Sequence, residues 1–370
     1  MKAAIFRKPH EPLTIEEIDV DEPRGHEVLV RTAATGVCHS DLHFVDGHLD
    51  LSAYAPPGLP NPSAVLGHEG AGIVEAVGEL VTHVVPGDHI VACLSGFCGT
   101  CEQCLSGFPA RCQGRINGRA HSETPRLSRD GTPIVQFVNV ASYAEEMLLH
   151  ENSLVKIDAE IPLDRAALVG CGVLTGVGAA LNTAKVRPGS TVAVFGCGGV
   201  GLSVVQGARI AGALQIIGVD TFASKKDMAT TMGATDFVDA SASDPVEAIH
   251  ELTGGQGVDY AFEAVGNPTL ARLALESTTV GGTATIVGIM PSDSTIEFPS
   301  AALRGEKKIQ TCGMGSNRFR FDIPRYLRFY ETGQLLLDEM VSKRGSLEDI
   351  NDAFRAMKAG EVARTVLTFD

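Results

Sequence analysis

The segment from Ser190 to Asp220, STVAVFGCGGVGLSVVQGARIAGALQIIGVD, constrains the fold of this chain more than any other. An apolar run rich in β-branched residues leads into a glycine loop of the form GxGxxG, and a stretch with helical periodicity and a second apolar run follow. This order predicts a strand, a tight loop, a helix and a parallel strand, which is one unit of an α/β sheet. In chain order the parts are 191–195, the loop glycines Gly196, Gly198 and Gly201, then 200–211 and 216–219.

The glycine loop indicates a binding site for a dinucleotide. Its glycines allow a tight turn, close approach of the backbone to a pyrophosphate and close packing of the helix, whose N-terminus attracts anions. Asp220 follows the second run, where an acid accepts hydrogen bonds from the adenosine ribose and repels a 2′-phosphate. We therefore expect NAD(H) rather than NADP(H), with Lys225 also near the ribose. The alternative is a glycine-rich turn that binds no ligand.

Strand-like runs alternate with helix-like spacers after this unit, as in DFVDA, VDYAFEAVG and TATIVGIM. The alternation predicts an α/β fold with a doubly wound parallel sheet over 171–310. Residues 1–170 contain instead short β-type runs between Gly and Pro turns, and predict an irregular β-rich domain. The C-terminal residues 311–370 are expected to return to that domain. A chain of 370 residues also favours two domains over one core.

Four cysteines lie within one short segment, FCGTCEQCLSGFPARCQ. Four soft donors from a chain that bends sharply suit a tetrahedral Zn²⁺ ion, and a metal with four protein ligands is structural. A ferredoxin-type run ends with a shorter gap followed by proline, so an iron–sulfur cluster is disfavoured. Unliganded cysteines at chance spacing are the remaining alternative. The four residues are Cys98, Cys101, Cys104 and Cys112.

Three other short, glycine-flanked segments carry residues typical of a catalytic zinc site: GVCHSDLH, LGHEGAG and LVGCGVLTGVG. A catalytic zinc takes three protein ligands, of which two Cys and one His is a known set, and keeps one position for water or substrate. Cys38, His68 and Cys171 fit that set. Taken singly, a cysteine is commonly a small buried hydrophobe and a histidine a satisfied core residue, so the sequence does not prove that the three converge.

Residues next to these candidate ligands strengthen the hypothesis. Asp41 and Glu69 are carboxylates that could hold an imidazole tautomer or tune the metal, although each could also be a solvated loop residue. Ser40 and His43 could pass a proton from a buried alcohol to solvent.

Composition excludes several other classes of function. The formal charge of −15 argues against nucleic acid as the main partner, because phosphate binding relies on a clustered cationic surface. The N-terminus lacks the apolar core of a signal peptide, and no apolar run approaches the ~20 residues that cross a bilayer. We therefore expect a cytoplasmic protein without a membrane partner, whose nine cysteines are thiols or metal ligands and not disulfides.

Over nearly its whole length the sequence resembles the zinc-dependent medium-chain alcohol dehydrogenases, in the branch of the liver-type enzymes and glutathione-dependent formaldehyde dehydrogenase. The resemblance implies a GroES-like β-rich catalytic domain, a Rossmann coenzyme domain, an active site in the cleft between them, and two zinc ions per subunit together with NAD. The stretches that carry it are GVCHSDLH, GHEGAGIVEAVG, CGTCEQC, GCGVLTGVGAALNTAKVRPGSTVAVFGCGGVGL, IIGVD and ARTVLTF.

The resemblance also implies roles for individual residues. Ser40 and His43 match the proton relay, with Asp41 and Glu69 beside the metal. The other matches are Cys38, His68 and Cys171 for the catalytic zinc; Cys98, Cys101, Cys104 and Cys112 for the structural zinc; His39 and Arg364 for the pyrophosphate; Thr175 and Val200 for the nicotinamide; and Leu94, Tyr143 and Ile289 for the substrate pocket.

Three stretches depart from the family pattern or add to it. The proline-rich loop Leu51–Val65 is longer than expected and is interpreted as an ordered loop that reshapes substrate choice. The acidic pattern that binds glutathione is not recognisable after His43, and Ser40 replaces a threonine, so oxidation of a thiol adduct ranks second. The cluster Arg111–Arg129 is either a solvated loop or, through Arg115 and Arg119, a binding site for an anionic substrate.

The function expected from these observations is NAD-dependent interconversion of an alcohol with an aldehyde or ketone. Zinc would act as a Lewis acid that favours the alkoxide, and hydride would pass to the nicotinamide. A non-catalytic NAD-binding regulator is the alternative from another class. A homodimer or homotetramer is expected, with the strand near TATIVGIM as a candidate for pairing across subunits. The sequence leaves open the substrate and its chain length, the preferred direction and the stereospecificity.

Overall fold

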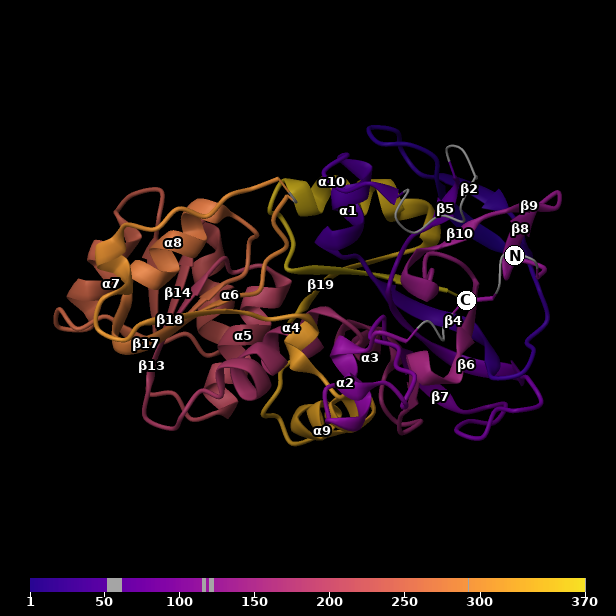
Figure 1. Cartoon of the computed structure of the whole chain (residues 1–370). Helices are drawn as coiled ribbons and strands as arrows, with labels where there is room; N and C mark the ends of the chain where they lie inside the picture. The colour runs from indigo at the N-terminus through magenta and orange to yellow at the C-terminus, as the bar shows by residue number, and fades with distance from the viewer. Residues whose placement is uncertain (52–61, 115–117, 120–122, 292, 370) are drawn as a thin grey trace. The chain divides into compact units, whose positions relative to one another are not determined.

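The computed structural model of the chain describes residues 1–370 except 52–61, 115–117, 120–122, 292 and 370 (Figure 1). Most of the proline-rich loop Leu51–Val65 therefore lies outside the described residues. The chain forms two compact units, each built from more than one segment. The first is Met1–Cys171 with Arg318–Tyr330 and Leu337–Asp370, and the second is Gly172–Asn317 with Glu331–Leu336. The expected ranges differ from these units at Cys171, which belongs with the first unit, and at 311–317 and 331–336, which belong with the second unit.

The first unit is β-rich, as its turn-punctuated sequence predicts. A seven-stranded sheet has the order β12-β7-β6-β4-β20-β19 with β11 also on β4, and the smaller sheets are β10-β5-β1-β2 and β3-β8-β9. Its strands are β1 (Lys2–Phe6), β2 (Thr14–Glu17), β3 (Asp19–Val20), β4 (Glu27–Gly36), β5 (Ala64–Val65), β6 (Glu69–Val77), β7 (His89–Ala92), β8 (Leu127–Arg129), β9 (Thr132–Pro133), β10 (Val135–Gln136), β11 (Glu146–His150), β12 (Leu154–Lys156), β19 (Val341–Gly345) and β20 (Arg364–Thr368).

Short helices accompany these strands. The C-terminal tail packs in this unit, since β20 pairs with β4, and Ile350, Phe354 and Met357 of α10 join the core of β1 and β5. Ser346 and Asp349 form a capping box ahead of α10. The helices are α1 (His39–Val45), α2 (Glu102–Leu105), α3 (Leu163–Val169), α9 (Phe319–Glu331) and α10 (Ile350–Lys358), with 3₁₀ turns η2 (Pro109–Arg111), η3 (Phe137–Asn139), η4 (Glu151–Ser153) and η9 (Leu347–Asp349).

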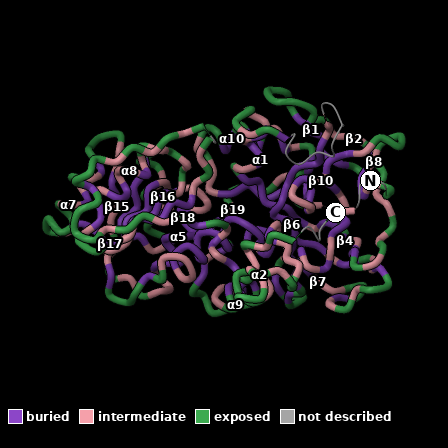
Figure 2. Tube along the Cα trace, viewed as in Figure 1, coloured by how far each residue is buried: buried purple, intermediate pink, exposed green. Residues whose placement is uncertain are grey.

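The second unit contains one six-stranded parallel sheet in the order β15-β14-β13-β16-β17-β18. Counted along the unit this is the order 3-2-1-4-5-6, so the predicted doubly wound sheet is confirmed. Its buried residues follow the strands (Figure 2). The strands are β13 (Thr191–Phe195), β14 (Gln215–Asp220), β15 (Asp236–Asp239), β16 (Val258–Glu263), β17 (Thr278–Ile286) and β18 (Lys308–Thr311). The helices are α4 (Gly172–Gly178), η5 (Ala179–Ala184), α5 (Gly199–Ile210), η6 (Ala223–Lys225), α6 (Lys226–Met232), α7 (Pro245–Leu252), α8 (Pro268–Glu276), η7 (Ser300–Leu303) and η8 (Met314–Ser316).

The strand near TATIVGIM, expected to pair across subunits, lies inside the sheet and not at its edge. The stretch TATIVGIM begins in β17, which pairs with β16 on one side and β18 on the other. Its backbone groups are therefore already used within the sheet, and β15 and β18 are the strands at the sheet's edges.

The described residues contain no single helix long and apolar enough to cross a bilayer; only Leu163–Val169 and Gly172–Ala184 taken together, as a bent pair, reach that length and composition.

The arginine cluster stabilises the first unit. The side chains of Arg119 and Arg126 are only 8% and 6% exposed, and both bind the carboxylate of Glu27 at the start of β4, with Arg119 Nη2 2.5 Å and Arg126 Nε 2.7 Å from its oxygens. Arg119 also pairs with Asp21. The interpretation as a solvated loop is therefore wrong for these two arginines. The interpretation as a binding site for an anionic substrate is wrong for Arg119, because its guanidinium already binds these carboxylates. Arg115 lies outside the described residues.

Replacing Glu27 should destabilise the protein strongly. Burial opposes ionisation of Glu27, but the guanidinium groups of Arg119 and Arg126 outweigh it and hold its pKa below the usual value. Among the described residues, Glu27→Gln leaves the buried guanidinium of Arg126 without a carboxylate and Arg119 with Asp21 alone. We expect a loss of about 3–5 kcal/mol in the free energy of unfolding near pH 7. Because the folded-state pKa is lowered, the advantage of the native protein exists above the usual glutamate pKa of about 4.3 and shrinks as the pH falls below it.

Denaturant unfolding across this pH range measures the effect, with Asp352→Asn as the matched control. Asp352 pairs with Arg355 on the exposed surface, where a lost ion pair costs about 0–1 kcal/mol. Equal losses for the two variants, or a Glu27→Gln loss that grows on acidification, would contradict the buried network.

Candidate metal and dinucleotide sites

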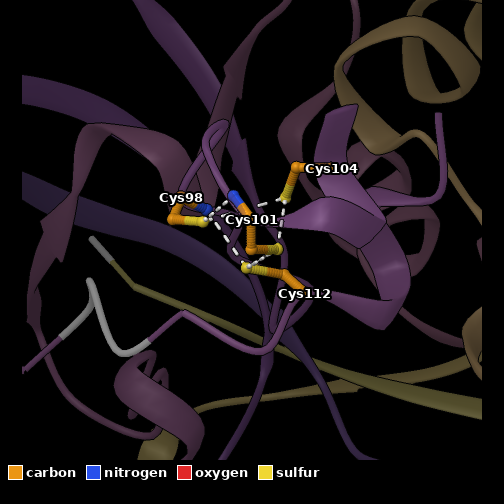
Figure 3. Close-up of side chains that lie close together, drawn as sticks. All are labelled: Cys98, Cys101, Cys104 and Cys112. Carbon is orange, nitrogen blue, oxygen red and sulfur yellow. Dashed lines mark hydrogen bonds between the residues drawn. The ribbon is translucent and has the colours of Figure 1, made fainter. Parts of the chain in front are cut away.

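The four clustered cysteines point toward one another in the loop that holds α2 and η2 (Figure 3). The Sγ atoms of Cys101 and Cys104 are 3.5 Å apart, those of Cys101 and Cys112 3.9 Å, and those of Cys98 and Cys104 4.0 Å. Four sulfurs at about 2.3 Å from one tetrahedral ion are about 3.8 Å apart. The residues therefore fit a closed zinc site.

Backbone groups of the same loop favour thiolates in this cluster. The amides of Thr100 and Cys101 donate to Cys98 Sγ at 3.4 and 3.3 Å. Hydrogen bonds from Thr100 lower the pKa of Cys98 to about 5, whereas burial raises the pKa of Cys104 to about 12. Sulfurs held by backbone donors are typical of a site for a cation, which displaces the remaining thiol protons on binding.

A second cluster brings together donors from three distant segments of the first unit. The ligand atoms of Cys38, His68, Glu69 and Cys171 all lie within 4.8 Å of one another, and all four side chains are buried. Cys38 directly precedes α1, His68 precedes β6, and Cys171 follows α3. Two sulfurs, one imidazole and a nearby carboxylate suit a catalytic zinc. The convergence that the sequence could not prove is therefore present.

Asp41, on α1, orients the imidazole of His68. Its Oδ1 accepts hydrogen bonds from His68 Nδ1 at 3.2 Å and from the Gly67 amide at 2.9 Å, and Tyr143 donates its hydroxyl to Oδ2 at 2.9 Å. His68 Nε2 is buried and has no hydrogen-bond partner among the described residues. A buried ring nitrogen without a partner fits a metal ligand whose other nitrogen is held by a carboxylate.

Glu69 is tied to Arg364 at the start of β20. Arg364 Nη2 donates to Glu69 Oε1 at 2.8 Å, Arg364 Nη1 donates to the Val37 carbonyl at 3.2 Å, and both side chains are buried. A Cβ at Gly36 would lie 2.1 Å from Glu69 Oε2, so the carboxylate occupies the space that this glycine leaves. The guanidinium of Arg364 therefore lies beside the metal cluster, and its contact with a pyrophosphate stays a prediction.

The electrostatics of the cluster support one thiolate and a charged imidazole. The hydrogen bond from the Cys171 thiol holds the pKa of Cys38 well below its usual value, and the same bond raises the pKa of Cys171 well above it. Burial alone would lower the pKa of His68, but Asp41 and Cys38 raise it well above the usual value. A metal ion that binds here displaces the proton of His68, because a ligating imidazole is neutral.

The relay candidates lie on α1 beside the cluster. Ser40 is half-buried, with Oγ 3.8 Å from Cys38 Sγ. His43 is also half-buried, and its Nδ1 is 3.4 Å from Nδ1 of His48, an exposed residue that the sequence analysis missed. The available signal was a second histidine five residues after the predicted relay histidine, just beyond the end of α1. His39 is exposed at the first position of α1.

The glycine loop of the second unit has the geometry predicted for it. Gly196 adopts a φ of +95°, which L side chains rarely reach. A Cβ at Gly201 would lie 1.7 Å from the Gly196 carbonyl oxygen, so α5 packs directly on the loop. Nothing lies within 4 Å of a Cβ built at Gly198, the N-cap of α5. The helix N-terminus is therefore open to a phosphate.

Asp220 ends β14 next to this loop. Its Oδ2 accepts the Cys197 amide at 2.8 Å and Lys225 Nζ at 3.2 Å, and its Oδ1 accepts the Phe222 amide at 3.0 Å. Thr175 of α4 is buried and donates to Met314, while Val200 is half-buried in the first turn of α5.

The residues expected to line a substrate pocket belong to both units, and their shared role stays a prediction. Tyr143 is completely buried and points its hydroxyl at Asp41, Leu94 packs partly buried against the core of β4 and β6, and Ile289 is about half exposed in the second unit. One hint of the contact between Tyr143 and Asp41 was present in the sequence. A buried tyrosine needs a hydrogen-bond partner for its hydroxyl, so a tyrosine in an apolar stretch predicts such a contact.

Comparison with known protein families finds two matches. Residues 24–159 match the alcohol dehydrogenase GroES-like domain, and residues 199–332 match the zinc-binding dehydrogenase family. Together they account for more than half of the chain.

Individual relatives agree over the full length. The chain is 39% identical to an alcohol dehydrogenase class-3 of Zea mays over 99% of this chain and 96% of the relative. An alcohol dehydrogenase zinc-binding domain protein from Burkholderia ambifaria superposes with a TM-score of 0.91 at 37% identity, covering 100% of this chain and 98% of the other. Benzyl alcohol dehydrogenase from Acinetobacter calcoaceticus superposes with a TM-score of 0.90 at 33% identity, covering 100% of this chain and 99% of the other.

Zinc analysis should separate the two metal centres. We expect about two zinc ions per chain in the native protein, and about one in each of Cys38→Ser and Cys104→Ser, because each removes one thiolate from a different cluster. Cys38→Ser should keep the native thermal stability more closely than Cys104→Ser, since a structural zinc contributes directly to folding. Cys197→Ser, on a buried thiol outside both clusters, is the control. Two zinc ions in the Cys38→Ser variant would count against the second cluster.

Proposed function

Because the chain belongs to the zinc-dependent medium-chain alcohol dehydrogenases, NAD-dependent enzymes that interconvert alcohols with aldehydes or ketones, we propose that Cys38, His68 and Cys171 hold its catalytic zinc. The observation that carries this proposal is the convergence of three donors from distant segments within 4.8 Å. We propose further that the four sulfurs of the Cys98–Cys112 loop hold the structural zinc.

The reaction divides between the bound groups and the chain. When bound, zinc supplies a Lewis acid that lowers the pKa of an alcohol hydroxyl, and NAD accepts the hydride. Asp41 fixes His68 in one tautomer by accepting from Nδ1, and Arg364 holds Glu69 in place. The chain therefore contributes alignment and charge, which favours reaction over mere binding.

Protons leave through α1 in this proposal. Ser40 accepts the proton released by the alcohol, and His43 receives it next. The contact of His43 with His48 at 3.4 Å then leads toward the surface. His43 accepts a proton only while it is neutral. Burial, followed by the neighbouring His48, lowers the pKa of His43, which keeps it neutral to lower pH.

Replacing His48 should shift the pH dependence of turnover. Without the electrostatic effect of His48, the pKa of His43 rises toward its usual value, so the acid limb of the kcat profile in His48→Gln should move to higher pH. His250→Gln, on α7 of the other unit, is the control. A limb that stays in place or moves to lower pH would contradict the relay.

For the coenzyme, we propose that Gly196, Gly198 and Gly201 receive the pyrophosphate and Asp220 the adenosine ribose. His39, Arg364, Thr175, Val200 and Lys225 are further proposed coenzyme contacts, on the family resemblance. The open Cβ position at Gly198 and the buried carboxylate at the end of β14 support the proposal.

Asp220→Gly should loosen the preference for NAD over NADP, because it removes both the acceptor for the ribose hydroxyls and the charge that repels a 2′-phosphate. We expect the ratio of kcat/KM values to fall by about 10–100-fold, as for loss of a charged hydrogen-bonding group. Asp236→Gly, on the neighbouring strand β15, controls for loss of an acid. Equal rates with both coenzymes in the native protein would refute the assignment.

An absorbance assay of NADH formation with a panel of alcohols tests the function itself. The panel includes short, long-chain and acidic primary alcohols, benzyl alcohol and a hydroxymethyl thiol adduct, which covers the second-ranked substrate class. The proposal expects turnover in a protein with two zinc ions per chain. One zinc and no turnover would favour the non-catalytic alternative.

We also propose a homodimer or homotetramer in the cytoplasm. Edge strand β18 has a hydrogen-bonded neighbour on one side only among the described strands, and Val280, Leu303 and Ile309 are exposed apolar residues of this region. Nine cysteines without a disulfide are consistent with a reducing compartment. Gel filtration determines the size of the assembly.

A further inference from the structure

Tyr143 reaches the metal cluster through one buried carboxylate. The Tyr143 hydroxyl lies 2.9 Å from Asp41 Oδ2, the other oxygen of that carboxylate lies 3.2 Å from His68 Nδ1, and the tyrosine and the aspartate have no solvent exposure. Tyrosine, aspartate and histidine thus form one chain of hydrogen bonds that ends at His68 Nε2, the ring nitrogen without a hydrogen-bond partner among the described residues.

The position of Tyr143 is fixed by the backbone on both sides. Its amide donates to the Leu66 carbonyl at 3.1 Å, and its own carbonyl accepts from the Ala4 amide at 2.9 Å. Gly67, with a φ of +86°, lies so close that a Cβ there would be 2.6 Å from Tyr143 Cδ1. The ring therefore packs on the turn that presents the Gly67 amide and His68 to Asp41.

The hydroxyl of Tyr143 acts as a donor in this arrangement. Burial, followed by the charge of Asp41, raises the pKa of Tyr143 well above its usual value, so the phenol keeps its proton. A carboxylate accepts hydrogen bonds only, so the proton of the phenol lies toward Asp41. The phenol ring itself packs edge-on against Phe354 of α10.

We propose that Tyr143 is a positioning residue for the metal ligand His68, acting through Asp41. The hydroxyl fixes the carboxylate so that its other oxygen stays on His68 Nδ1. It also draws negative charge away from His68, because a carboxylate that already accepts a strong hydrogen bond attracts a second proton less. The imidazole then donates less to a metal, and a metal held by a weaker donor is the stronger Lewis acid. This inference rests on the proposed catalytic zinc site.

Tyr143→Phe isolates the hydroxyl, because it keeps the ring, and three measurements on the zinc-loaded enzyme test the idea. Partners of metal-bound histidines typically change metal affinity by about 10–100-fold, and Tyr143 is one contact further away. In Tyr143→Phe the carboxylate that orients His68 is no longer fixed, and we expect this loss of positioning to outweigh the stronger donation by the imidazole. The catalytic zinc should then be lost to a chelator about tenfold faster. The structural zinc of the same molecule, which should be lost at the native rate, is an internal control.

The other two measurements report the electronic effect. The visible spectrum of enzyme with Co²⁺ at the catalytic site should shift in Tyr143→Phe. The pH at which kcat reaches half its plateau should also rise in Tyr143→Phe. The metal would be a weaker Lewis acid in this variant, so the pKa of the alcohol would be higher. Neither should change in Tyr330→Phe, whose hydroxyl donates to Asp338 at the surface.

Replacement of Tyr143 with 3-fluorotyrosine keeps the inference testable if Tyr143→Phe does not fold. A fluorinated phenol is a stronger donor of the same shape, so the midpoint of the kcat profile should fall. In an Asp41→Asn background neither change at Tyr143 should move the profile, since the hydroxyl acts through the carboxylate charge.

Opposite outcomes are distinguishable. Lower thermal stability of Tyr143→Phe with an unchanged chelator rate, cobalt spectrum and pH profile would show that Tyr143 only fills the core, and would overturn the inference while leaving the proposed function in place. Absence of a second zinc or of alcohol turnover in the native enzyme would overturn both.

Discussion

The buried carboxylate of Asp41 is the interaction on which the proposed active site depends. Asp41 lies on α1, the helix that begins directly after Cys38, and its carboxylate binds the turn that carries His68. One side chain therefore joins two of the three segments that supply metal donors. A charged group without solvent exposure is very costly unless donors surround it, and here Gly67, His68 and Tyr143 all donate to it. The two segments are therefore held together by hydrogen bonds of the protein itself.

The two proposed metal centres are built in opposite ways. The four sulfurs of the structural centre come from one short loop, whose own amides stabilise thiolates, so the loop needs little from the rest of the fold. The catalytic cluster instead needs β4, β6, α1 and α3 in place, because its donors adjoin different elements. The proposed coenzyme site depends on the order of strands in the parallel sheet. The glycine loop follows β13, and Asp220 ends the adjacent strand β14. The proposed catalytic and coenzyme sites thus adjoin the seven-stranded and the six-stranded sheet, the two largest sheets of the chain.

Contiguous patterns of the sequence were sufficient for the parallel sheet, the glycine loop and the cysteine loop, because their chemistry depends on neighbours along the chain. Contacts between distant residues could not be predicted in the same way. Arg119 appears in the sequence as one of several loop arginines, and only folding shows that it binds Glu27. The hydroxyl of Tyr143 likewise finds Asp41 through the fold, where the family resemblance suggested a pocket wall. Pairing in the sheet also decided that β17 is internal, since the sequence of a strand does not say which strands flank it.

The central claim is that Cys38, His68 and Cys171 surround one zinc ion. Anomalous diffraction collected on either side of the zinc absorption edge tests it most directly, because it locates zinc without assuming a ligand set. We expect two peaks per chain: one within bonding distance of these three side chains, and one enclosed by the four sulfurs of the cysteine loop. A single peak at the cysteine loop, in crystals grown from zinc-saturated and catalytically active protein, would contradict it.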